Sequence, residues 1–178
     1  MHERNIQYGK MRLPNLMELY LLRHGIADDD SPTGKDADRP LTEEGRRKLR
    51  DTIKTLAAAG VKLGSIVSSP YVRAKESAEI AKGILGFKDD LLMSNALTPE
   101  ADPQDLWQEI RSVYRGSDCV MFASHEPFMS RCTAYLLGSP ALMVDFKKGA
   151  VVRIDIDQFG IQPRGVLKWM LVPKLARS

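Results

Sequence analysis

The chain has 178 residues, 43% of them hydrophobic and 28% charged, which is the size and composition of one globular domain that needs no disulfide or structural metal to fold. Its formal charge is +3, because residues 1–16 carry +2, residues 161–178 carry +4 and the remaining residues 17–160 carry −3. This acidic middle argues against a nucleic-acid partner. The longest apolar runs are far too short to cross a membrane, and charged residues interrupt the N-terminus where a signal peptide would be apolar, so we expect no membrane partner.

The first predicted elements are an N-terminal extension and a buried strand. Residues 1–16 have no clear hydrophobic periodicity, so we expect an extension there, ahead of a single domain over residues 17–178. Met17 directly precedes the strand and is a candidate alternative start of translation, which N-terminal sequencing of the native protein would test. Residues 18–23 are rich in strand formers and predict a buried strand that ends at His24.

An acidic loop and a helix come next. Residues 25–40 hold five aspartates and are typical of a loop. Thr42 predicts a helix N-cap, with two glutamates in the positive first turn, and Gly60 is a stop signal. The predicted inner face of this helix consists of Leu49, Ile53 and Leu56.

A second strand and two helices are predicted for the middle of the chain. Residues 63–67 predict the strand, and Ser69-Pro70 predicts the N-cap and first position of a helix. Asp102-Pro103 predicts the start of another helix in the same way. The expected inward-facing residues are Ala74, Ala78, Ala81 and Leu85 in the first helix, and Leu106, Ile110 and Val113 in the second.

Three more strands and a helix complete the expected domain. The strands are predicted at residues 119–123, 151–157 and 166–172, and the helix from Pro127 to about Gly138. The two cysteines, Cys119 and Cys132, have no metal-ligand spacing, so we expect reduced, structural thiols in a cytoplasmic protein. The alternation of strands and helices predicts a layered α/β domain with a mostly parallel sheet.

Polar side chains gather where three of these strands end. Arg23-His24-Gly25 follows the first strand, residues 68–73 follow the second, and Ser124-His125-Glu126-Pro127 follows a later one. Taken singly, each has an ordinary structural reading, such as a helix cap or an arginine on a solvated face. Together they bring two histidines and two arginines to one pocket, because sites form beyond the carboxyl ends of parallel strands.

These residue types point to phosphate chemistry. Two guanidinium groups, from Arg23 and Arg73, make an anion site beside helix N-termini, and arginine matches the geometry of phosphate oxygens. A neutral imidazole among cations is a nucleophile toward phosphorus. The sequence has neither an acidic cluster with metal spacing nor a Gly-x-x-x-x-Gly-Lys loop, so we expect no metal and no cofactor.

The motifs resemble those of the histidine phosphatase superfamily. Arg23-His24-Gly25 is similar to its signature, Ser68-Ser69-Pro70-x-x-Arg73-Ala74 and Ser124-His125 to its second and third motifs, and Arg39-Pro40-Leu41-Thr42-x-x-Gly45 to its RPLTxxG segment. The resemblance spans about residues 17–157 and implies the phosphoglycerate-mutase-like fold, a three-layer αβα sandwich with a mostly parallel central sheet.

The short segment between the second and third motifs favours one branch of this superfamily. Only 51 residues separate Arg73 from His125, which leaves little room for the acid-bearing insertion of larger members and resembles the SixA-type phosphohistidine phosphatases. Ala101-Asp102-Pro103 and Phe146-x-Lys148-Gly149-Ala150 also look like this branch. Lys75-Glu76-Ser77 departs from the Gln-Thr pair of many members, but it concerns the helix around the site, so we expect activity to persist.

The resemblance implies a mechanism and a set of roles. The implied nucleophile is His24, which becomes phosphohistidine. The other implied catalytic residues bind the phosphoryl oxygens and are Arg23, Arg73 and His125. The backbone N–H of Glu126 is a further implied phosphate contact. Water then hydrolyses the intermediate. Asp28 and Glu126 are candidate proton donors. For each of them a purely structural role is the stronger interpretation: Asp28 lies in a solvated acidic loop, and Glu126 supports a helix N-terminus.

The missing insertion favours phosphohistidine as substrate. An alkoxide needs a proton to leave, whereas histidine leaves as an imidazole whose conjugate acid has a pKa of about 6.5. The expected partner is therefore a phosphohistidine-containing protein domain, or else a small phosphorylated substrate. Two alternatives stay open: a small-molecule phosphomonoesterase with the same nucleophile, and a non-catalytic phosphate-binding module.

Overall fold

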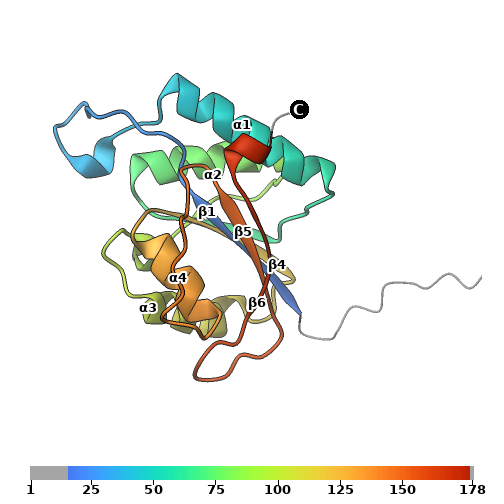
Figure 1. Ribbon diagram of the computed structural model, residues 1–178. Coiled ribbons are helices and arrows are strands. Elements are labelled where there is room, and N and C mark those ends of the chain that lie inside the picture. The colour runs from blue at the N-terminus through green and yellow to red at the C-terminus, as the bar shows by residue number, and fades with distance from the viewer. Residues whose placement is uncertain (1–15, 177–178) are drawn as a thin grey trace, which may run out of the picture.

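A six-stranded sheet forms the centre of the computed structural model, which describes residues 16–176 (Figure 1). The strands are β1 (Met17–Arg23), β2 (Ser65–Ser68), β3 (Leu92–Met93), β4 (Cys119–Ser124), β5 (Val151–Ile156) and β6 (Val166–Leu171), in the order β3-β2-β4-β1-β5-β6. The first four in that order run parallel, whereas β5 and β6 add antiparallel pairings at one edge. The mostly parallel sheet is confirmed. The predicted extension, apart from Leu16, lies outside the described residues.

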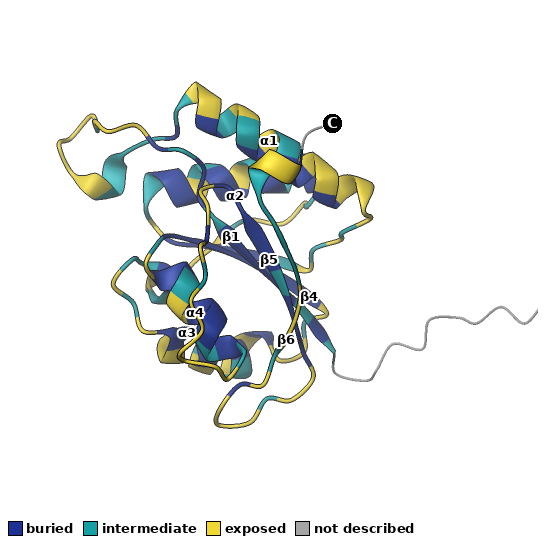
Figure 2. Cartoon of the chain, viewed as in Figure 1, coloured by how far each residue is buried: buried dark blue, intermediate teal, exposed yellow. Residues whose placement is uncertain are grey.

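Helices cover both faces of this sheet. The helices α1 (Glu43–Ala58) and α2 (Val72–Leu85) lie on one face, and α3 (Pro103–Glu109) and α4 (Phe128–Leu136) lie on the other (Figure 1). Side chains of β1 point alternately to the two faces of the sheet and so contribute to the core on both. Leu19 and Leu21 pack toward α3 and α4, whereas Tyr20 and Leu22 pack toward α1 and α2. Figure 2 shows buried residues along the sheet and exposed residues on the outer faces of the helices. The three-layer prediction is confirmed.

The loop after β1 is fixed against the start of α1. Thr42 is the N-cap, and its hydroxyl accepts a hydrogen bond from the Gly45 N–H at 3.0 Å, as predicted. The Thr42 N–H in turn donates to the Ile26 carbonyl at 2.9 Å. A Cβ on Gly45 would collide with that carbonyl and stand 2.8 Å from the Ile26 nitrogen, so only glycine fits here. This packing holds the chain just beyond His24 against a helix.

The predicted start of α2 is wrong by two residues. The helix begins at Val72, with Tyr71 as N-cap, rather than at Pro70. The reason is that Ser69 still belongs to the sheet edge, where its N–H donates to the Ala123 carbonyl at 2.9 Å. Its hydroxyl accepts from the Tyr71 N–H at 3.4 Å and also lies 2.8 Å from Nε2 of His125. The short strand β3 was not predicted, since two exposed residues carry no periodicity.

The predicted inward position of Val113 is also wrong. Val113 is 63% exposed, whereas the next residue, Tyr114, is only 5% exposed. A π-helical turn over Ile110–Tyr114 follows α3 and inserts one extra residue into the helical register. The residues after it are rotated, so Tyr114 takes the place in the core that an unbroken helix would give to Val113.

Cys119 on β4 and Cys132 on α4 are both buried, and no disulfide joins them. Between residues 16 and 176, no helix has the length and apolar character needed to cross a membrane.

Candidate active site

Three neighbouring strands bring the predicted polar residues together. β2, β4 and β1 are adjacent and parallel, so their carboxyl ends meet at one edge of the sheet. In the register, Arg23 lies opposite Ser124, and Ser68 lies opposite Ala123. The segments that follow these residues carry His24, Ser69 and His125, and they therefore leave the sheet side by side.

His24 is buried, with one ring nitrogen fixed. Its Nδ1 lies 2.6 Å from the Gly25 carbonyl oxygen, which can only accept, so in the neutral ring Nδ1 carries the hydrogen and Nε2 keeps the lone pair. The residue is 6% exposed. Burial lowers the pKa of His24 to about 3, helped by the charges of Arg73 and Arg23 and opposed by the Gly25 carbonyl. At neutral pH the site thus holds an unprotonated, oriented imidazole.

His125 lies against His24. The two ring centroids are 5.0 Å apart, and the His125 ring also packs on Tyr71 at 5.0 Å. Its Nε2 lies 2.8 Å from the Ser69 hydroxyl. The residue is 1% exposed, and burial, together with His24 and Arg73, lowers the pKa of His125 to about 2. Both histidines are therefore neutral donors or acceptors at neutral pH rather than cations.

The two arginines reach the same place from different elements. Arg73, in the first turn of α2, is buried and lies over the Tyr71 ring at 5.1 Å. Arg23, the last residue of β1, donates from Nη1 to the Phe146 carbonyl. Burial lowers the pKa of Arg23, opposed by the charges of Glu126 and Asp145, but a guanidinium remains charged at neutral pH. The site therefore carries positive charge beside two neutral imidazoles.

Two buried polar atoms at this place have no hydrogen-bond partner in the described part of the protein. Across residues 16–176, three buried side-chain nitrogen or oxygen atoms have no hydrogen-bond partner: Arg23 Nε, His125 Nδ1 and Ser31 Oγ. Two of the three belong to the residues just described. A buried polar group without a partner costs about 1–3 kcal/mol, so a ligand that supplied the missing bond would be bound favourably here. A phosphoryl group offers acceptor oxygens to the arginine and, in its donor tautomer, to the histidine.

The two candidate proton donors, Asp28 and Glu126, make their hydrogen bonds to residues outside the cluster of two histidines and two arginines. Glu126 is half-buried next to His125, and its two carboxylate oxygens lie 2.9 and 2.8 Å from the Ser130 hydroxyl. Asp28 is exposed, and its Oδ1 lies 3.4 Å from the Asp30 nitrogen, within the solvated loop. The acid in contact with Arg73 is instead Asp36, which is bonded to both terminal nitrogens of that arginine. Sequence reasoning missed this contact.

Residues 75–77, which depart from the pattern of many members of the superfamily, connect the elements around the site by hydrogen bonds. The Ser77 hydroxyl donates to the Arg73 carbonyl at 2.7 Å and accepts from the Gly25 N–H at 3.1 Å. Glu76 accepts from the Arg46 guanidinium at 2.6 Å and from the Leu41 N–H at 2.7 Å. These residues tie α2 to the loop after β1 and to the start of α1, and they surround the two histidines and two arginines.

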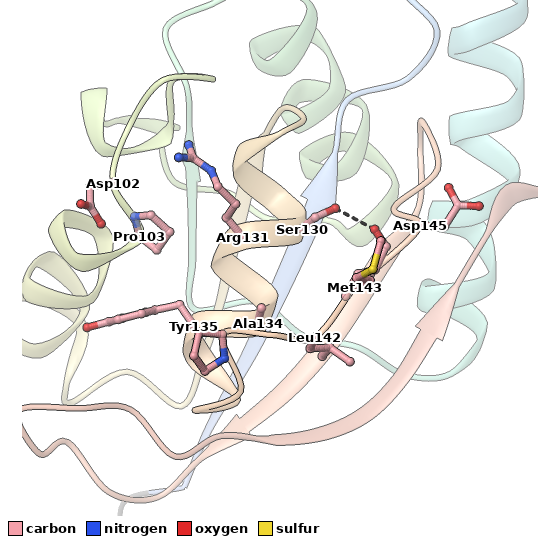
Figure 3. Close-up of a pocket in the computed structure, with 11 residues that line it drawn as sticks. Asp102, Pro103, Ser130, Arg131, Ala134, Tyr135, Leu142, Met143 and Asp145 are labelled. Atoms are coloured by element: carbon pink, nitrogen blue, oxygen red, sulfur yellow. Dashed lines mark hydrogen bonds between the residues drawn. The ribbon is translucent and has the colours of Figure 1, made fainter.

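A separate cavity of about 630 Å³ lies beside α4 (Figure 3). It is lined by Tyr135 and Arg131 from the helix, by Pro103 at the start of α3, and by Leu142 and Met143 on the following loop. Neither histidine and neither arginine of the site lines it. The cavity is therefore distinct from the candidate phosphoryl site.

Comparisons with known proteins agree with this fold. A family model described as the histidine phosphatase superfamily (branch 1) matches residues 19–93. The phosphohistidine phosphatase SixA of Escherichia coli K12 is 25% identical over 166 residues, which cover 91% of this chain and 99% of that protein. A solved structure of the protein histidine phosphatase SixA complexed with tungstate matches with a TM-score of 0.79 at 25% identity, over 89% of this chain and 98% of that one.

A further relative is an uncharacterised protein of Picosynechococcus, 42% identical over 64 residues. That match covers 36% of this chain and 39% of that protein. Taken together, the comparisons support the histidine phosphatase superfamily and, within it, the SixA-type branch, which confirms the resemblance seen in the motifs. A phosphatase is the class of enzyme that they support.

Proposed function

We propose that the protein is a phosphohistidine phosphatase that works through a covalent phosphohistidine at His24. The observation that carries this proposal is the His24 ring, whose Nδ1 is held by the Gly25 carbonyl at 2.6 Å while burial lowers its pKa to about 3. The lone pair on Nε2 is then available for attack at neutral pH. An oriented, unprotonated imidazole beside guanidinium groups is suited to phosphoryl transfer.

In the first step, His24 Nε2 forms a bond to phosphorus and the bond from phosphorus to the leaving group breaks. Arg23 and Arg73 hold the phosphoryl oxygens, whose negative charge develops in the transition state. His125 adds a hydrogen bond to an oxygen, with its ring position set by the Ser69 hydroxyl at 2.8 Å. The N–H of Glu126 is a further proposed phosphate contact, since it follows His125 directly.

In the second step, water attacks phosphorus and the bond to His24 Nε2 breaks. The electron pair returns to that ring nitrogen, and inorganic phosphate leaves. Nδ1 keeps its hydrogen throughout and donates it in a hydrogen bond to the Gly25 carbonyl, so the nucleophile is regenerated in the tautomer in which it began.

The choice of phosphohistidine rests on the acids at the site. Hydrogen bonds from Arg39 and Arg73 keep the pKa of Asp36 below its ordinary value, so Asp36 is ionised and is a poor proton donor. The Glu126 carboxylate is directed to Ser130. An imidazole leaving group needs less protonation than an alkoxide, so this arrangement favours a phosphoramidate.

The expected partner is a phosphohistidine-bearing protein domain. We expect no metal and no cofactor in the reaction, since two arginines already supply the positive charge that phosphate requires. The buried thiols Cys119 and Cys132 fit a reducing compartment, and we propose the cytoplasm.

The test compares the wild-type protein with His24→Ala on three substrates: a histidine-phosphorylated protein domain, a phosphorylated sugar and p-nitrophenyl phosphate. We expect turnover of the first by the wild type, little turnover of the other two, and a loss of at least a thousandfold in His24→Ala. EDTA should leave the rate unchanged. Equal rates in the two proteins would overturn the mechanism, preference for the sugar phosphate would make the protein a phosphomonoesterase, and vanadate binding without turnover would make it a binding module.

A further inference from the structure

Asp36 is a charged residue at the site that the proposed mechanism does not use. It begins the 3-10 turn Asp36–Asp38 in the acidic loop between β1 and α1. Its carbonyl accepts from Arg73 Nη1 at 2.6 Å, and its Oδ2 accepts from Arg73 Nη2 at 2.9 Å. Its second carboxylate oxygen, Oδ1, accepts from Arg39 Nη1 at 2.9 Å. A single residue therefore holds both ends of the phosphate-binding guanidinium.

The carboxylate of Asp36 lies at the mouth of the site. Its side chain is 58% exposed, whereas that of Arg73 is 7% exposed, so the carboxylate is the solvent-facing member of the pair. It is also within electrostatic reach of the second histidine, because its charge opposes the lowering of the His125 pKa. A group that approaches the phosphoryl site from solvent therefore meets a negative charge beside Arg73.

We propose that Asp36 determines which leaving group the enzyme accepts, by hydrogen-bonding the N–H of a protonated phosphoimidazole ring and by repelling leaving groups that carry negative charge. This inference rests on the proposed function. Residues 28–39 contain five aspartates against Lys35 and Arg39, so the rest of the loop adds to the same negative field.

The chemistry of phosphohistidine explains why a carboxylate helps. The ring leaves as neutral imidazole when its other nitrogen already carries a proton taken from solvent. The bond from His24 Nε2 to phosphorus forms, the bond from phosphorus to the substrate nitrogen breaks, and the electron pair stays on that substrate nitrogen. A neighbouring carboxylate favours the protonated ring, as it does any imidazolium. An alcohol that bears a carboxylate would meet like charge in the same place and be disfavoured.

The experiment measures kcat/KM for the histidine-phosphorylated protein domain of the proposed function and for phosphoglycolate, an ester whose alcohol carries a carboxylate. Asp36→Asn removes the charge but keeps an oxygen that can accept from Arg73, whereas Asp36→Ala removes both. Asp38→Asn is the matched control, because it removes the same charge from the same turn, and the Asp38 carboxylate accepts from the Thr33 hydroxyl instead. The phosphohistidine to phosphoglycolate ratio should fall about tenfold in Asp36→Asn and stay within about twofold in Asp38→Asn.

A residue that merely positions Arg73 would give a different pattern. Asp36→Asn would then leave the ratio unchanged, and Asp36→Ala would lower the rates on both substrates by the same factor; either result overturns the inference. An equal change of the ratio in Asp38→Asn would also overturn it, since the effect would belong to the loop as a whole. A wild-type enzyme that is inert toward phosphohistidine would refute the proposed function itself, whereas an active wild type with an unchanged ratio in Asp36→Asn refutes this inference alone.

Discussion

Lowering the pH should destabilise the fold through the buried histidines of the site. The pKa of His24 is about 3 in the folded protein, against 6.5 for the free side chain. Between these two pH values the unfolded chain binds a proton that the folded chain does not, so acid favours unfolding. The contribution of this neutral histidine is complete above about pH 6.5 and is lost as the pH falls toward 3.

The magnitude follows from the two pKa values. At about pH 4.5, the free-energy penalty for His24 is about 2–3 kcal/mol, which is a large part of the stability of an ordinary domain. The assay is urea unfolding of the wild type and of His24→Asn at pH 7 and at pH 4.5. The variant should lose about 2–3 kcal/mol less than the wild type over this interval.

The difference between the two proteins isolates the histidine. Carboxylates with lowered pKa values, such as Asp36 and Glu44, also weaken the fold in acid, but they are present in both proteins. Removal of His24 also removes one of the causes that lower the pKa of His125, which acts in the same direction. Equal losses of stability in the wild type and in His24→Asn would refute the reasoning.

Two further predictions concern residues that hold the site in place. Ser69→Ala should lower kcat about five- to tenfold with little change in the urea midpoint, because the hydroxyl 2.8 Å from His125 Nε2 orients that ring; an unchanged kcat would show that the ring is held by packing on Tyr71 alone. Gly45→Ala should destabilise the protein by about 3 kcal/mol, because a Cβ there would collide with the Ile26 carbonyl; thermal unfolding checks this, and a wild-type melting temperature would contradict it.

Much of the site could be predicted because it depends on local order along the chain. Arg23 and His24 directly follow one buried strand, and His125 directly follows another. Once alternating strands and helices imply a parallel sheet, the carboxyl ends of its strands must meet at one edge. For these three residues the argument needs no knowledge of how any loop folds. Arg73 joins them because the first turn of α2 follows a few residues after the end of β2.

The wrong and missed predictions concern features that local order along the chain does not determine. Each depends on a partner that is distant in the sequence or on a change of helical register. The pattern Ser69-Pro70 is a helix start by local propensity, but the pairing of Ser69 with β4 outweighs that propensity. The π-helical turn that exposes Val113 leaves no mark in the apolar spacing. Asp36 meets Arg73 only because the loop between β1 and α1 folds back over the start of α2.

The most direct measurement is the identification of the phosphorylated enzyme. The wild-type protein is mixed with a histidine-phosphorylated domain, quenched in alkali within one turnover to preserve acid-labile phosphoramidates, digested and sequenced by mass spectrometry. The mechanism predicts a phosphoryl group on His24, absent from the same peptide in His24→Ala and lost when turnover is allowed to finish. Turnover with the phosphoryl group on any other residue, or with no phosphorylated enzyme at all in the quenched sample, would contradict it.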